Sequence, residues 1–132
     1  MDKLEYIPGD LVMTKTEPNN FVPNGVVCEF VSYGNRNKVL VRAAKGIDTF
    51  FLEKGQITPI PLTPEILEKN GWREDKGDYI NDSYHIILCE KYDSFSAYKG
   101  VNNSIVWLRD VRNISDLQHL LFGLNINSEM EV

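Results

Sequence analysis

A chain of 132 residues that is 42% hydrophobic and 25% charged has an ordinary globular composition, and it suits one compact domain or two very small ones. No apolar run approaches ~18 residues and the first ten residues contain no apolar signal region, so the sequence predicts no membrane span and a cytoplasmic protein. The net charge of −5 is uneven: residues 1–62 carry seven basic and seven acidic side chains, whereas residues 63–132 carry seven and twelve. An acidic second half repels phosphate backbones, which argues against general nucleic-acid binding.

The first half of the chain has the pattern of short strands separated by turns. Strands are expected at residues 11–13, 26–33, 38–42 and 47–52. Residues 16–25 hold two prolines, three asparagines and a glycine, and they predict a long loop. Strands of this number and length with tight turns indicate a small closed barrel over residues 1–62. The segment Pro-Gly-Asp-Leu-Val before the long loop resembles Src-homology-3-like barrels.

The clearest helix signals of the chain lie directly after this predicted barrel. Thr63 can cap a helix, and Pro64 occupies the first helical position, where a missing N–H costs nothing. Asn70 and Gly71 supply a left-handed stop. The start and stop signals agree, so the sequence predicts a helix over residues 63–70.

The connector between the two halves is apolar and stiffened by prolines, which suits docking rather than free tethering. Each half is also too small to close its own core comfortably. We therefore expect the halves to pack as one unit, with four apolar residues buried between them. These residues are Ile60, Leu62, Leu67 and Trp72.

The second half predicts an antiparallel meander of about four strands followed by a helix. The strongest strand signal covers residues 84–92. In residues 115–124 four leucines recur at i, i+3, i+4 and i+7, and Ser115 can cap that helix. The polar tail, residues 125–132, is expected to fray. The predicted fold class is α+β, with a small Src-homology-3-like β-barrel at 1–62 and a helix, antiparallel sheet and C-terminal helix at 63–132.

Two sets of residues are candidate binding sites. Phe21 lies in the long loop, where it either covers the core edge as a lid or, together with Trp72, anchors a protein partner in an aromatic groove. The second set is a basic cluster on the hairpin of the predicted barrel, which is either a solvated hairpin or a phosphate or nucleic-acid contact. Its members are Arg36, Lys38, Arg42 and Lys45.

The sequence predicts no catalytic, metal or cofactor site. His85 lies in an apolar predicted strand, and His119 lies on the polar face of the last predicted helix, where local helical spacing builds no catalytic triad. Cys28 and Cys89 form no C-x-x-C motif, so we expect free, buried thiols in a reducing compartment rather than a disulfide or a metal centre.

Two blocks of the sequence resemble an uncharacterised family of small proteins encoded by Bacteroidetes and by their phages and mobile elements. The first block is matched by Pro59, Ile60, Pro61, Leu62, Thr63, Glu65, Leu67, Gly71 and Trp72. The second block is a Leu-Gln-x-Leu helix core, matched by Leu117, Gln118 and Leu120 with Phe122 following. Family members often carry a histidine at the position of Ser115. The resemblance implies a source and no known activity.

Three functional hypotheses follow from the sequence. The first is a non-enzymatic protein-binding adaptor of a mobile element, a phage or its host, with an unknown protein partner. The second is a nucleic-acid-associated accessory protein that acts through the basic hairpin. The third is a small hydrolase that depends on His119. The oligomeric state is left open.

Overall fold

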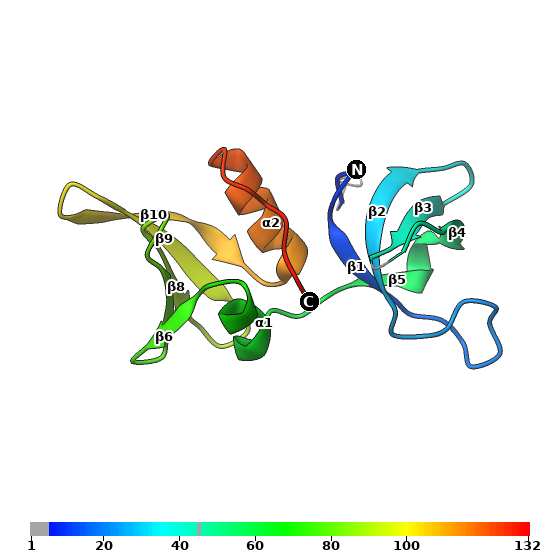
Figure 1. Ribbon diagram of the computed structural model, residues 1–132, viewed down its shortest axis with the longest axis horizontal. Helices are drawn as coiled ribbons and strands as arrows, with labels where there is room; N and C mark the ends of the chain where they lie inside the picture. The colour runs from blue at the N-terminus through cyan, green and yellow to red at the C-terminus, as the bar shows by residue number, and fades with distance from the viewer. Residues whose placement is uncertain (1–5, 45) are drawn as a thin grey trace. The chain divides into compact units, whose positions relative to one another are not determined.

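The computed structural model describes residues 6–44 and 46–132, and the chain forms two compact units. Unit 1 comprises Met1–Ile60 and unit 2 comprises Pro61–Val132. Two antiparallel five-stranded sheets and two α-helices make up the described chain, so the predicted α+β class is confirmed (Figure 1).

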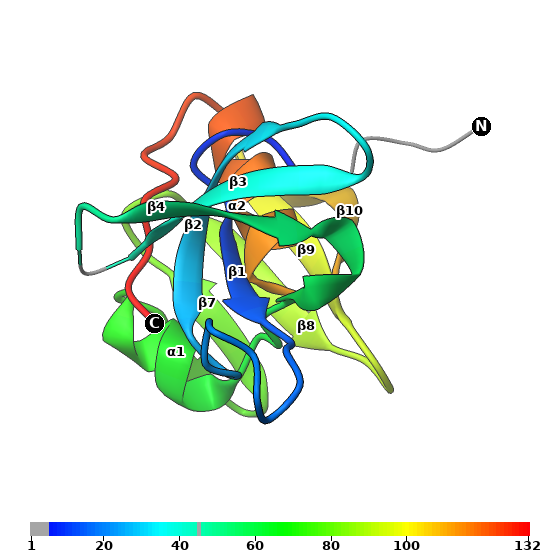
Figure 2. The same ribbon diagram turned by 90° about the vertical axis from the view of Figure 1, so that its right-hand side faces the viewer.

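Unit 1 is built on one antiparallel sheet with the strand order β4-β3-β2-β1-β5. Its elements are β1 (Leu11–Thr14), β2 (Val27–Tyr33), β3 (Lys38–Ala43), β4 (Thr49–Glu53), the 3-10 turn η1 (Lys54–Gln56) and β5 (Ile57–Pro59). The long loop between β1 and β2 leaves the sheet at one end (Figures 1 and 2). Alternate residues of the strands face one core, as the period of two in a strand requires. The core side chains are Tyr6, Val12, Cys28, Phe30, Val39, Val41, Leu52 and Ile57.

The closed barrel predicted for residues 1–62 is not found among the residues that the structure describes. The ladder runs from β4 to β5, and no ladder between described residues joins these two end strands. β5 has three residues and includes Pro59, which has no N–H to donate. The strand that would have to close the barrel therefore has little hydrogen-bonding capacity of its own.

Unit 2 combines a second antiparallel sheet, of order β10-β9-β8-β7-β6, with two helices. Its elements are α1 (Pro64–Lys69), β6 (Arg73–Asp75), β7 (Asp78–Asn81), β8 (Ile86–Glu90), β9 (Phe95–Val101), β10 (Ser104–Val111) and α2 (Ile114–Gly123). About four strands were expected here and five are present; the first two, β6 and β7, pair with each other as a hairpin. Both helices lie on one side of this sheet (Figure 1).

The local signals at α1 produce the predicted helix. The Thr63 hydroxyl accepts a hydrogen bond from the Ile66 N–H at 3.3 Å, and Gly71 has a φ of 89°. The backbone then folds back, because the Trp72 N–H donates to the Leu67 carbonyl at 3.0 Å. Leu67 and Trp72 are buried, as are Ile60 and Leu62, while the packing of the two units against each other stays a prediction.

Two predictions about the end of the chain are wrong. The cap of α2 is Asn113 and not Ser115, because the Asn113 side-chain oxygen accepts both the Asp116 N–H at 2.9 Å and the Ser115 hydroxyl at 2.8 Å. The tail does not fray in the structure. The Asn70 side chain donates to the Glu131 carbonyl at 2.7 Å and accepts the Glu131 N–H at 2.8 Å, which fixes the tail to the end of α1.

No helix in the described ranges is long and apolar enough to cross a membrane.

Candidate functional site

The two aromatic residues expected to anchor a partner have opposite environments. Phe21 is fully exposed, at 100% of its reference area, so its interpretation as a lid on the core is wrong. Its neighbour Val22 packs against the core of unit 1, and the Thr16 hydroxyl holds the Val22 carbonyl at 2.7 Å. Trp72 is 4% exposed and has no ring surface free for a partner. The structure therefore leaves Phe21 available as a contact and turns Trp72 inward.

The basic hairpin of unit 1 carries acidic neighbours. The Arg42 guanidinium lies 3.9 Å from the Glu29 carboxylate, and Lys38 is the register partner of Glu53 on β4. Arg36 sits in the turn with a φ of 57°, and no ion pair links it to another described residue. The fourth candidate, Lys45, lies outside the described residues. Two of the three described cations thus face carboxylates that weaken the local positive potential.

The histidines and cysteines are dispersed. His85 does not lie in a strand as predicted; it precedes β8 in a turn with a φ of 56°. Both thiols are free, and burial raises the pKa of Cys28 and, together with the charge and hydrogen bond of Asp78, the pKa of Cys89. Cys28 is buried and Cys89 is half-buried. Within residues 6–44 and 46–132 no group of three or more His, Cys, Asp or Glu side chains could hold a metal ion.

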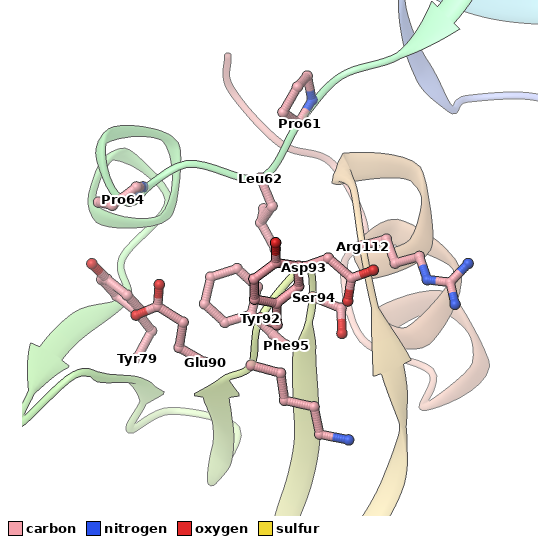
Figure 3. Close-up of a pocket in the computed structure, with 11 residues that line it drawn as sticks. Pro61, Leu62, Pro64, Tyr79, Glu90, Tyr92, Asp93, Ser94, Phe95 and Arg112 are labelled. Atoms are coloured by element: carbon pink, nitrogen blue, oxygen red, sulfur yellow. The ribbon is translucent and has the colours of Figure 1, made fainter.

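A half-open pocket of about 260 Å³ lies in unit 2, beside the start of α1. Figure 3 shows the Leu62 side chain pointing toward the loop of Asp93 and Ser94, while the Arg112 side chain points away. Burial and the nearby glutamates raise the pKa of Tyr79, which also lines this pocket. The volume is below the ~300–1,000 Å³ of typical small-molecule sites, and its charged groups do not converge. The pocket is therefore a weak candidate for a ligand site.

The stronger candidate is the face of the unit 2 sheet opposite its buried side chains. Tyr79, Leu88 and Ala97 are register partners on the buried face. The alternate residues point the other way, and the pairings of β7, β8, β9 and β10 place four large apolar side chains in one line across the sheet. This apolar row consists of Ile80, Ile87, Tyr98 and Trp107.

The apolar row is partly open to solvent, and most so at its β10 end. Ile80, Ile87 and Tyr98 are half-buried, whereas Trp107 is 55% exposed. Ile105, next on the same face of β10, is 61% exposed. Isolated exposed apolar residues are common on protein surfaces, whereas a contiguous row of this kind is a candidate interaction site.

Trp107 lies at the end of the apolar row, and a carboxylate follows it on the same face of β10. A bulge between Trp107 and Arg109 shifts the register, so that Asp110 falls on the same face as the indole. The Asp110 carboxylate accepts the Ser96 hydroxyl at 2.9 Å and the Lys91 ammonium at 3.3 Å. These hydrogen bonds, with the charge of Lys91, hold the pKa of Asp110 below its usual value. The ring is thus exposed beside the hydrogen-bonded Asp110 carboxylate.

The strands that carry the apolar row can be expected from the sequence, but the alignment of their residues cannot. Strand signals cover residues 84–92 and 105–108, yet which residues become neighbours depends on the three registers between four strands. The turn at Asn102 and Asn103, with φ of 46° and 68°, is the one local signal that sets the register of Tyr98 against Trp107.

Comparison with known proteins finds no family model, no curated protein and no solved structure that matches this chain.

Proposed function

We propose that the chain is a non-enzymatic binding module whose protein partner docks on the apolar row of unit 2. The observation that supports this proposal most is the indole of Trp107, which is 55% exposed at the end of a continuous apolar line. Tryptophan and tyrosine are the residues most enriched at the energetic centres of interfaces. Tyr98 and Trp107 supply both on neighbouring strands.

The charge of unit 2 supports a protein partner over a nucleic acid. Residues 61–132 contain twelve acidic and seven basic side chains, so this unit carries the whole net charge of −5, while residues 1–60 are balanced at seven and seven. A polyanion would be repelled from this unit, whereas a basic protein surface would be attracted to it.

Two further proposals concern the fold of unit 1 and the family of the chain. The strand order β4-β3-β2-β1-β5, the long loop after β1 and the 3-10 turn before β5 support a Src-homology-3-like fold for unit 1. The block from Pro59 to Trp72 supports kinship with the small proteins of Bacteroidetes, their phages and mobile elements. On that basis the role of the chain is that of an adaptor of a mobile element or its host.

A nucleic-acid-associated role through the hairpin of unit 1 is the second proposal. Its support is the exposed position of Arg36 in the turn and the exposed ring of Phe51 beside it. That ring packs against Gly34 at the start of the turn, where an added Cβ would lie 3.4 Å from it. Binding to DNA or RNA that weakens with salt and is lost when Arg36, Lys38 and Arg42 are replaced by Glu would support it.

Affinity capture with matched variants tests the first proposal. The wild-type chain, Trp107→Ala, Tyr98→Ala and the control Phe122→Ala are immobilised and exposed to lysate of the native host, and captured proteins are quantified by mass spectrometry. Phe122 is a suitable control because it is 67% exposed on α2 of the same unit. We expect a partner that the wild type and Phe122→Ala retain and that both apolar-row variants lose. Equal capture by all four proteins would contradict the proposal.

A further inference from the structure

The free edge of β10 is unlike the other end of its sheet. β10 has eight residues, and four consecutive apolar residues, 105–108, lie within it. The opposite end strand, β6, has three exposed residues, Arg-Glu-Asp. Short, charged edge strands prevent pairing with other chains, whereas a long apolar edge invites it. The sheet therefore leaves one end protected and the other open.

The hairpin geometry shows which backbone groups of β10 are available. The two-residue loop of Asn102 and Asn103 makes its flanking residue Ser104 a hydrogen-bonded partner of β9. Hydrogen-bonded and non-hydrogen-bonded pairs alternate along an antiparallel ladder. Ile105 and Trp107 therefore direct their N–H and C=O groups away from β9, toward the open edge. A strand placed there would meet two donor–acceptor pairs.

The same two residues connect the edge to the apolar row. Their side chains lie on the face that carries Tyr98, so a strand added beside β10 would extend the apolar row by one more line of side chains. Beyond Trp107 the bulge interrupts the regular ladder, which limits the added strand to a short segment.

The negative charge of unit 2 favours a basic partner segment over a second copy of the chain at this edge. A second copy of the chain would bring another unit with five excess negative charges against the first. A basic segment would instead be attracted by the acidic side chains of unit 2. Lys91 is already engaged by Asp110, and Arg109 lies 3.6 Å from Asp116. The Lys99 ammonium donates to the Tyr84 carbonyl at 2.8 Å, so these three basic groups near the edge already have partners within the same unit.

The geometry points to β-strand addition at β10: an extended segment of a basic partner protein pairs with Ile105 and Trp107 and places alternate apolar side chains on the apolar row. This inference rests on the proposed function and specifies its partner class. Backbone pairing would supply affinity, and the alternating side chains would supply specificity.

A displayed library of random decapeptides, selected on the full-length chain, tests this inference. We expect enriched peptides with alternating apolar residues and Lys or Arg flanks, whose Kd rises with salt. Ile105→Pro removes one outward N–H that β9 does not use, and it should weaken binding about tenfold, as expected for one lost hydrogen bond. Ile105→Ala, which keeps that N–H, should weaken it less than about threefold. Circular dichroism verifies that both variants are folded.

Each alternative outcome has a distinct meaning. Peptides that are lost on Trp107→Ala but tolerate Ile105→Pro would overturn strand addition and leave the proposed function intact. Peptides that bind Trp107→Ala and Ile105→Pro as tightly as the wild type would contradict both the proposed function and strand addition. An absence of enriched peptides, acidic peptides, or a dimer in analytical ultracentrifugation that dissociates on Ile105→Pro would overturn the basic partner segment as the occupant.

Discussion

The two tryptophans of unit 2 test the assignment of Trp72 to the core and of Trp107 to the surface. Trp72 is 4% exposed and follows α1, where its N–H donates to the Leu67 carbonyl and Leu67 itself is fully buried. Trp107 is 55% exposed on the open face. Truncation of a buried Trp to Ala removes a large apolar side chain and leaves a cavity, at a cost of about 3–5 kcal/mol. Trp107→Ala is a surface change and should cost less than about 1 kcal/mol.

Urea denaturation followed by far-UV circular dichroism measures both free energies of unfolding without using tryptophan fluorescence. In thermal melts, at ~4 °C per kcal/mol for a chain between the small and the larger domains, Trp72→Ala should lower the Tm by roughly 12 °C or more, and Trp107→Ala by less than about 4 °C. We also expect one unfolding transition for both units, because each is small for independent stability. Equal costs for the two variants would refute the assignment of one ring to the core and the other to the surface. Two separated steps would refute the coupling of the units.

Three further predictions follow from the caps, the tail and the carboxylates of unit 2. Asn113→Ala should cost about 1 kcal/mol in urea denaturation as a lost N-cap, and no measurable change would contradict the capping role. Asn70→Ala should release the tail, so that the Glu131 amide exchanges with solvent faster in hydrogen-exchange mass spectrometry. Unchanged exchange would contradict the role of the Asn70 side chain in fixing the tail. Because the pKa of Asp110 is lowered in the folded state, its stabilising contribution is present above the ordinary carboxyl pKa of ~3.9 and is lost as pH falls through the lower folded value. Fluorescence of Trp107 in a Trp72→Phe background should therefore change below about pH 4 and not in Asp110→Asn, and a transition shared by both proteins would exclude Asp110 as its source.

Helix α1 was predictable because its signals are local. Thr63, Pro64 and the Asn70-Gly71 stop each act within one turn of the helix, and the sequence places them at the right spacing. At α2 the local signals compete, since Asn113 and Ser115 can both cap a helix. The structure selects Asn113, and the Ser115 hydroxyl then donates to it.

The features that the sequence did not predict depend on contacts between distant residues. Barrel closure depends on whether the end strands of unit 1 meet, and β5 is too short and too proline-rich to show this locally. The polar tail had no visible partner in the sequence, because the amide of Asn70 lies 61 residues away from Glu131. The apolar row likewise exists only when the three registers between β7, β8, β9 and β10 combine, and none of its members is unusual alone.

Site-specific photocrosslinking in cells tests the central claim, a partner on the apolar row, most directly. A photoreactive phenylalanine analogue is placed at Tyr98, which lies within the row, and at Phe122, which is exposed on α2 of the same unit. After irradiation in the native host, we expect a discrete covalent adduct between the chain and one basic protein from position 98, and none from position 122. Loss of that adduct on Trp107→Ala would complete the expected result. Adducts from position 122 alone, or equal adducts from both positions, would contradict the assignment of the apolar row as the binding face.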